Sequence, residues 1–202
     1  IENSKPAEAN MIHRIASISK PMTAIAILQL MEKGMLDLED PIQKYIPNFP
    51  IKKEGTITIR QLLNHSSGIK AYKNSKEAFP TKNYTTLRQA ISVFENRGLE
   101  GKPGEQYGYT TYGYVILGYI IEIASGVSYQ KYMQENIWNV AGMTHTDVEI
   151  YGQKYPGKSK LYTKNKEGEF VNDKSTNLSI KVPGGGIQST VSDLLKFAEA
   201  IL

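Results

Sequence analysis

Residues 14–24 read RIASISKPMTA and place a hydroxyl and an amine at the point where a long apolar helix is predicted to begin. Ser17 and Lys20 are three residues apart, so on a helix they share one face and can point into the same cleft. A serine is a poor nucleophile until a base takes its proton, and a lysine acts as that base only when its pKa is lowered. This spacing therefore predicts a nucleophilic serine with a lysine base.

The predicted helix runs from about Ser17 to Lys33. Pro21 lacks a backbone N–H and is tolerated only in the first turn, which puts the helix start near Ser17, and Gly34 ends the helix. Apolar side chains lie on nearly every side, which predicts a buried helix. The partial positive charge of a helix N-terminus favours an alkoxide or an oxyanion, and burial would lower the pKa of Lys20.

The same Ser-x-x-Lys spacing occurs twice more, at Ser67/Lys70 and Ser128/Lys131. A glycine separates the members of the first pair, which favours a loop over a shared helical face. The second pair opens a short predicted helix, where the serine is better explained as an N-cap and the lysine as a solvated side chain. Only the pair in residues 14–24 combines a helix N-terminus with an apolar helix behind it.

Composition narrows the class of protein. The chain has 202 residues, of which 40% are hydrophobic and 22% charged, and this is typical of one globular domain. The formal net charge is +4 with scattered lysines, so no nucleic-acid surface is predicted. The absence of cysteine excludes disulfides, thiolate metal sites and a cysteine nucleophile. No apolar run approaches the roughly 18 residues of a membrane-spanning helix, and no signal-peptide pattern opens the chain.

The histidines give no alternative chemistry. His13, His65 and His145 lack the spacing of a zinc site, and no G-x-S-x-G turn is present for a Ser-His-Asp triad. No metal and no cofactor are therefore predicted. Gly184-Gly185-Gly186 lacks the G-x-G-x-x-G continuation of a nucleotide loop. It reads either as a tight turn or as a loop whose backbone approaches a ligand.

A tyrosine-rich segment, residues 107–114, precedes a second apolar helix. Acyl transfer often needs a second hydroxyl to pass the proton to the leaving group, and Tyr109 is a candidate for that role. The alternative is that Tyr109 is one of many tyrosines that pack as amphipathic groups. The remaining predicted elements are a helical subdomain over about 58–150, a hairpin and Gly-rich loop over 157–189, and a last helix from 191 that is capped at Thr190.

Four stretches, 14–24, 58–68, 103–118 and 185–190, follow one another in the order seen in the serine β-lactamase-related superfamily. The chain resembles its class C-like branch of β-lactamases, D-alanyl-D-alanine carboxypeptidases and esterases. Within that branch it is most similar to the mitochondrial serine β-lactamase-like group and its bacterial relatives. Four motifs in order are far more specific than any one of them.

The resemblance implies that Ser17 is the acylated nucleophile, Lys20 its general base and Tyr109 the tyrosine of the family's Tyr-x-Asn motif. Thr111 stands where that motif has asparagine. A hydroxyl is shorter than an amide and offers a different hydrogen-bonding geometry, which argues against efficient β-lactam hydrolysis. The residues implied to bind substrate are Thr111, Gly185 and Gly186.

The implied fold is α+β, of the β-lactamase/transpeptidase type, and residues 1–202 are expected to form a partial domain. This part holds the helical region, the nucleophile helix and a small hairpin. Much of the antiparallel sheet is expected outside the chain, together with the family's third motif, a Lys/His-x-Gly strand. That strand supplies an oxyanion-hole donor, and losing one donor costs on the order of 10²–10³ in rate.

The implied function is a serine hydrolase that forms an acyl-enzyme from an amide or ester, with a peptide, a small ester or a β-lactam as substrate. The alternative is a non-catalytic or weakly active scaffold that resembles penicillin-binding proteins and acts in assembly. The partner is then a small-molecule or peptide substrate. The family resemblance implies a location in the cell envelope or outside the cell.

Overall fold

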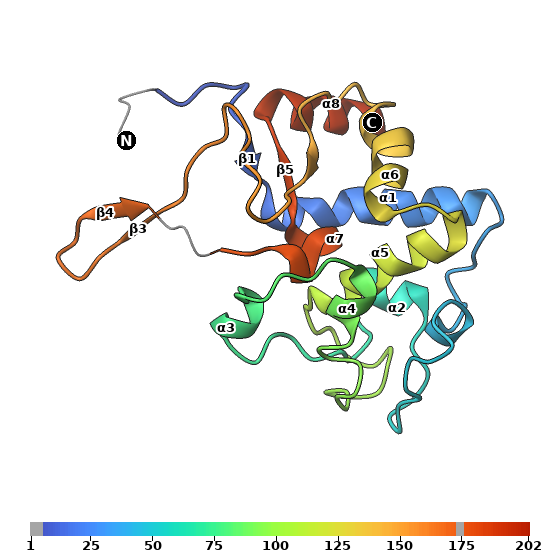
Figure 1. Cartoon of the computed structure of the whole chain (residues 1–202). Helices are drawn as coiled ribbons and strands as arrows, with labels where there is room; N and C mark the ends of the chain where they lie inside the picture. The colour runs from blue at the N-terminus through green and yellow to red at the C-terminus, as the bar shows by residue number, and fades with distance from the viewer. Residues whose placement is uncertain (1–5, 173–175) are drawn as a thin grey trace.

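Helices make up most of the molecule, and two small antiparallel sheets complete it (Figure 1). The computed structural model describes residues 6–172 and 176–202. The α-helices are α1 (Ser19–Glu32), α2 (Ile59–Leu63), α3 (Ser75–Ala78), α4 (Leu87–Ile91), α5 (Tyr112–Ser125), α6 (Tyr129–Met133), α7 (Val182–Gly185) and α8 (Val191–Ile201). The 3₁₀ turns are η1 (Ala16–Ile18), η2 (Ile42–Lys44) and η4 (Ser179–Lys181), and η3 (Gln134–Trp138) is a π-helical turn. The strands are β1 (His13–Arg14), β2 (Asp147–Val148), β3 (Tyr162–Lys164), β4 (Phe170–Asn172) and β5 (Ile187–Ser189).

Helix α1 crosses the middle of the molecule and packs on α5 and α7 (Figure 1). Met22, Ala26 and Leu30 recur every fourth residue and are fully buried, as expected for one face of a helix. Leu28, on another side, is 39% exposed. The predicted burial of α1 is therefore confirmed on the broad face that the neighbouring helices cover, and Leu28 lies on the side that they leave open.

The nucleophile candidate lies just before α1 rather than inside it. The α-helix begins at Ser19, and Ser17 belongs to η1. Pro21 is the third residue of α1, so its position in the first turn is confirmed. The helix ends at Glu32, close to the predicted end, and Gly34 follows with φ of 68°.

The caps that start the other helices follow from local sequence. Thr58 and Gln61 form a reciprocal capping box at α2, which satisfies two backbone donors. Thr86 and Thr190 cap α4 and α8 through their hydroxyls. Gly126 ends α5 in the left-handed conformation that favours glycine.

The three-stranded sheet brings the two ends of the chain together. Its order is β1-β5-β2, all antiparallel, with His13 opposite Ser189 and Asp147 opposite Gln188. The Gly-rich segment before β5 is therefore held beside η1. It was expected to be a loop, but its first two glycines end the helical turn α7, and β5 begins at Ile187.

Buried polar contacts fix α7 against α1. The Thr23 hydroxyl of α1 donates to the Pro183 carbonyl at 2.7 Å and lies 2.7 Å from the Tyr129 hydroxyl. The Ile187 N–H donates to the Ser19 hydroxyl at 3.3 Å, and the Ile15 N–H donates to the Ile187 carbonyl at 3.1 Å. Residues before, within and after the start of α1 are thus positioned by residues from the other end of the chain.

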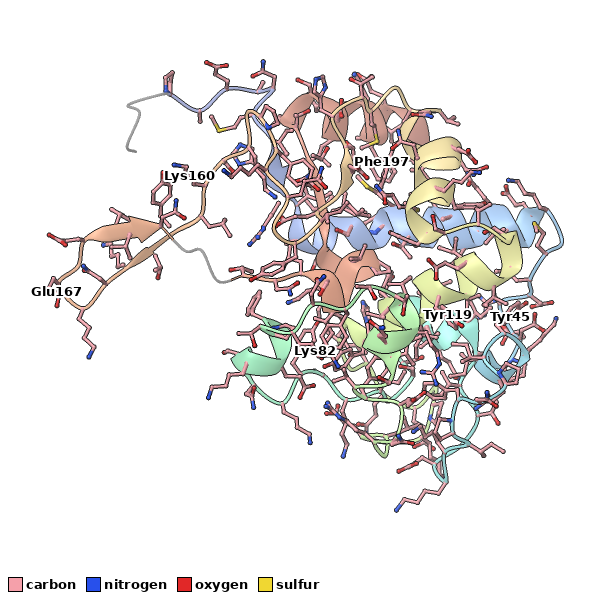
Figure 2. The ribbon with its side chains drawn as sticks, in the orientation of Figure 1. Tyr45, Lys82, Tyr119, Lys160, Glu167 and Phe197 are labelled. Atoms are coloured by element: carbon pink, nitrogen blue, oxygen red, sulfur yellow. The ribbon has the colours of Figure 1, made fainter. Side chains whose placement is uncertain are left out.

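The predicted hairpin is confirmed as β3 and β4, with Tyr162 opposite Asn172 and Lys164 opposite Phe170. It projects away from the helices (Figure 1). Glu167 lies in its turn, with its side chain in solvent (Figure 2). Among the described helices, none combines the length and apolar character needed to cross a bilayer.

Candidate active site

Ser17, Lys20 and Tyr109 come together at the start of α1. The Tyr109 hydroxyl donates to Ser17 Oγ at 2.7 Å, and Lys20 Nζ lies 3.2 Å from the same oxygen. Ser17 is exposed. The residue before it, Ala16, has φ of 47°, a conformation that is uncommon for a residue with a side chain and that costs energy.

Lys20 is only 4% exposed, although it is a lysine. Its ammonium is also 2.6 Å from the Gly184 carbonyl and 3.4 Å from Thr111 Oγ1. A neutral amine has two N–H donors and one lone pair. Donation to Gly184 and Thr111 then leaves the lone pair for the Ser17 proton. Burial lowers the pKa of Lys20, and the neighbouring Tyr109 opposes part of that shift.

Tyr109 is 47% exposed, and its hydroxyl is hydrogen-bonded to Ser17 Oγ. Burial alone would raise the pKa of its hydroxyl, but hydrogen bonds to Lys20 and Ser17 and the charge of Lys20 lower the pKa overall. Lys20 Nζ also lies 4.9 Å from the Tyr109 ring centroid. The tyrosine is therefore arranged to exchange a proton with both groups.

His65 packs against Tyr109, a position that was not predicted from the sequence. Its ring lies 4.5 Å from the ring of Tyr109, centroid to centroid, and 5.3 Å from that of Tyr114. Nδ1 accepts from the Thr110 N–H at 3.3 Å, which puts any ring proton of the neutral form on Nε2. Burial and the charge of Lys20 lower the pKa of His65, so the neutral ring is favoured. Its position in the motif stretch 58–68 was the available signal.

Gly184 is required at the contact with Thr111. A Cβ on Gly184 would lie 2.5 Å from Thr111 Cγ2, which is closer than two non-bonded carbon atoms approach each other. A Cβ on Gly185 would have Lys181 Cδ as its nearest neighbour, at an ordinary contact distance of 3.6 Å. A Cβ on Gly186 would lie 2.7 Å from the Val182 backbone. The close approach at Gly184 is what brings its carbonyl to the Lys20 amine.

A cavity of about 370 Å³ adjoins Ser17. Of the three residues predicted to bind substrate, Thr111 and Gly185 line it, and Gly186 packs against Val182 instead. Its lining also includes a residue that the sequence did not single out, the buried Lys181. The other lining residues are Arg14, Ala16, Phe79, Leu161, Thr176, Leu178 and Gly184.

Arg14 lies at the edge of this cavity and is paired with Glu149. Its Nε and Nη2 donate to the two carboxylate oxygens of Glu149 at 2.6 and 2.5 Å, and Lys158 pairs with the same carboxylate at 2.8 Å. Burial would raise the pKa of Glu149, but these two cations lower it overall. The carboxylate is therefore held charged, and Arg14 is fixed in place.

Comparison with known proteins identifies the family of the chain. The chain matches the Beta-lactamase family over residues 1–202. It is 31% identical to the human mitochondrial serine beta-lactamase-like protein LACTB, over 100% of this chain and 49% of LACTB. It is 34% identical to penicillin-binding protein 4* of Bacillus subtilis, over 98% of this chain and 46% of that protein. The chain thus spans about half the length of these curated relatives.

Solved structures show the same fold. A penicillin-binding protein from Bacillus halodurans superposes with a TM-score of 0.87 and 26% identity, over 99% of this chain and 62% of that one. D-amino acid amidase from Ochrobactrum anthropi SV3 superposes with a TM-score of 0.85 and 25% identity, over 100% of this chain and 58% of that one. The predicted α+β fold of the β-lactamase/transpeptidase type is confirmed, and the chain belongs to the Beta-lactamase family.

Proposed function

We propose that this protein is a serine hydrolase that cleaves an amide or ester through an acyl-enzyme on Ser17. The observation that carries the proposal is the pair of contacts at Ser17 Oγ, to Lys20 Nζ at 3.2 Å and to the Tyr109 hydroxyl at 2.7 Å. A nucleophile within hydrogen-bonding reach of a base that is itself oriented by further groups is the arrangement that acyl transfer needs.

In the acylation half-reaction, Ser17 Oγ attacks the substrate carbonyl carbon while its proton moves to the neutral amine of Lys20. The carbonyl π electrons move onto oxygen, and the Ser17 N–H donates to this oxyanion near the positive end of α1. Collapse of the intermediate re-forms the carbonyl and breaks the bond to the leaving amine or alcohol. That group takes a proton from Tyr109, which recovers one from Lys20.

Deacylation repeats the sequence with water as the nucleophile. Water adds to the ester carbonyl and gives its proton to the Lys20–Tyr109 pair, and Ser17 Oγ leaves as it regains a proton. The net reaction consumes one water and releases the carboxylic acid. Burial of Lys20 serves both steps, because it favours the neutral base at the start of each.

Peptides, small esters and β-lactams are the proposed substrate classes. The names of relatives, a penicillin-binding protein and a D-amino acid amidase, support amide chemistry of this kind. Thr111 presents a hydroxyl 3.4 Å from Lys20 where the resemblance implies an asparagine. We therefore expect esters to react faster than β-lactams, because the shorter side chain holds a substrate carbonyl in a different geometry.

The test uses the full-length protein with a chromogenic ester and a fluorescent penicillin. Wild-type protein is expected to hydrolyse the ester and to carry covalent penicillin, and the Ser17→Ala variant is expected to do neither. Folding of both is checked by circular dichroism. A folded wild-type protein that neither turns over the ester nor retains the penicillin would refute the hydrolase.

A second candidate is an assembly protein without efficient catalysis. A penicillin-binding protein homologue from Pyrococcus abyssi is described as octameric, and it superposes with a TM-score of 0.83 and 30% identity over 98% of this chain and 46% of that one. Light scattering with an ester assay separates the two candidates. A monomer that hydrolyses the ester refutes the assembly role, and an inactive ring or oligomer supports it.

The proposed location is the cell envelope or the space outside the cell, as the resemblance to penicillin-binding proteins implies. Fractionation of the source cells, followed by immunoblotting of the soluble, membrane and secreted fractions, tests it. Recovery of the protein only from the cytoplasmic fraction would contradict this location.

A further inference from the structure

Lys181 is a buried cation that faces the cavity beside Ser17. It ends η4, its side chain lines the cavity, and the residue is 8% exposed. Its ammonium lies 3.9 Å from the ring centroid of Phe79 and 4.9 Å from that of Tyr72. In Figure 1 the chain that enters α7 passes beside α3, next to which Phe79 lies. The lysine thus contacts two aromatic rings at the edge of the cavity.

No anionic partner accompanies this lysine within residues 6–172 and 176–202. Its ammonium forms no ion pair there, and the cavity lining contains no aspartate or glutamate. The charges that act on it, those of Lys20 and Arg14, are both positive; with burial as the larger cause, they lower the pKa of Lys181 to about 8. Arg14 has Glu149 as a counter-ion, whereas Lys181 has none in the described structure.

A purely structural lysine is the simpler explanation, with the two rings holding its charge by cation–π contact. Such rings offer a quadrupole but no net charge, so they offset only part of the cost of removing an ammonium from water. Phe79 is itself 48% exposed, and both it and Lys181 line the cavity. A bound carboxylate would supply the missing opposite charge and a charge-assisted hydrogen bond.

We propose that Lys181 binds a carboxylate carried by the acyl part of the substrate. The apolar side chains of Leu161 and Leu178 line the same cavity and would contact the carbon chain between the carboxylate and the reacting carbonyl. This inference rests on the proposed function, because the acyl group is held in the cavity by its bond to Ser17. It deepens that function by naming an acidic acyl group as the preferred substrate class.

The test compares two chromogenic esters with the same leaving group, the mono-4-nitrophenyl ester of suberic acid and its neutral suberamide analogue. Because both esters react at Ser17 with the same leaving group, the ratio of their kcat/KM values measures the effect of the carboxylate alone. We expect the full-length wild-type protein to prefer the acid by about tenfold, the scale of one hydrogen bond to a charged group. Lys181→Met should abolish the preference mainly through KM, and Lys181→Arg should retain it.

Lys131→Met is the matched control, because it also removes one lysine charge but at a position where the side chain is 58% exposed. Its ratio should equal that of the wild type. A wild-type ratio near one, or a Lys181→Met variant that keeps the preference, would overturn the proposal. Melting curves establish that each variant is folded.

Two further measurements keep the proposal testable if Lys181→Met does not fold or if no ester is cleaved. Raising the pH past about 8 deprotonates Lys181, so the wild-type preference should fall while that of Lys181→Arg stays constant; parallel behaviour would overturn the proposal. If neither ester is cleaved, the proposed hydrolase function is refuted. An NMR titration with suberamic acid and suberamide then tests the carboxylate site alone. Equal affinity for the two compounds would then refute it.

Discussion

The pairs Ser17/Lys20 and Ser128/Lys131 have the same spacing and both lie at the start of a helix, but they differ in every contact. At α6 the Ser128 hydroxyl accepts the Lys131 backbone N–H at 3.3 Å, as an N-cap does. The Lys131 side chain is 58% exposed and lies 3.9 Å from Glu135. The serine hydroxyl there is occupied by a backbone N–H, and the lysine amine contacts solvent and one surface carboxylate.

At α1 neither group has such a use. The α-helix has no side-chain cap at its start, so the Ser17 hydroxyl meets Lys20 and Tyr109 instead. Lys20 is buried, and its other acceptors come from Thr111 and Gly184. The comparison shows that burial and partners from distant segments, rather than spacing, turn a serine and a lysine into a reactive pair.

The largest predicted difference between the two pairs is at the serines. Ser17→Ala should reduce ester hydrolysis by at least about 10³-fold, because it removes the attacking atom. Ser128→Ala should leave hydrolysis unchanged and lower the free energy of unfolding by about 1 kcal/mol, through loss of the cap. Steady-state kinetics and urea denaturation measure the two effects. Equal losses of activity would erase the distinction between the pairs.

The lysines should differ in the same sense. Lys20→Met is expected to slow acylation by about 10²–10⁴-fold, since it removes the general base but keeps an unbranched side chain of similar length. Lys131→Met serves as the matched control and should acylate at the wild-type rate. Stopped-flow measurement of nitrophenol release gives the acylation rate. A Lys20→Met protein that is folded and fully active would contradict the assigned role.

Tyr109→Phe removes one hydroxyl and leaves the ring against His65. It should slow acylation by about 10²-fold, the lower end of proton-transfer catalysis, with a larger effect for an amide than for a nitrophenyl ester. A poor leaving group needs the proton that Tyr109 donates, whereas nitrophenolate does not. Equal effects on both substrates would assign Tyr109 to packing instead.

The pH dependence follows from the lowered pKa of Lys20. The base must be neutral, so the acylation rate should rise with pH as the Lys20 ammonium loses its proton, and it should level off below 10.5, the ordinary lysine value. Below the inflection the rise should be about tenfold per pH unit. The pH profile of single-turnover acylation measures it. A rate that keeps rising with pH past the ordinary lysine pKa would show that the pKa of Lys20 is not lowered.

The last predicted effect is on stability and concerns Gly184, the glycine that supplies an acceptor to Lys20. Gly184→Ala should lower the free energy of unfolding by about 1–3 kcal/mol, because its Cβ would overlap Thr111. Gly185→Ala, the matched control, has room for a Cβ and should cost less than about 1 kcal/mol. Denaturant titration of the two variants compares them, and equal losses would show that the close approach at Gly184 is not required.

Local sequence was sufficient for elements whose causes are local. The proline in the first turn of α1, the cap at Thr190 and the hairpin each depend on residues close together in the sequence, and those elements are where they were expected. The start of α1 was misplaced by two residues, because η1 precedes it and is held by β5 from the far end of the chain. The helix propensities of residues near Ser17 cannot predict that contact, because its partner is far away in the sequence.

The site itself was only partly predictable. Three residues followed from motif and resemblance, but the contact of Ser17 with Tyr109 joins positions 92 apart, and that of Lys20 with Gly184 joins positions 164 apart. Lys181 belongs to no motif that the sequence distinguished, and it acquires its setting only when Phe79 and the cavity wall surround it. Contacts of this separation are made by packing and cannot be inferred from spacing.

The most direct test of the contrast between the two pairs is to map the site of covalent labelling. Folded full-length protein is reacted with a fluorophosphonate, digested, and analysed by mass spectrometry for every serine. We predict a single modified serine, Ser17, with Ser128 and Ser67 unmodified. Labelling at Ser128, or labelling spread equally over the three serines, would contradict the claim that burial of Lys20 makes this pair the reactive one.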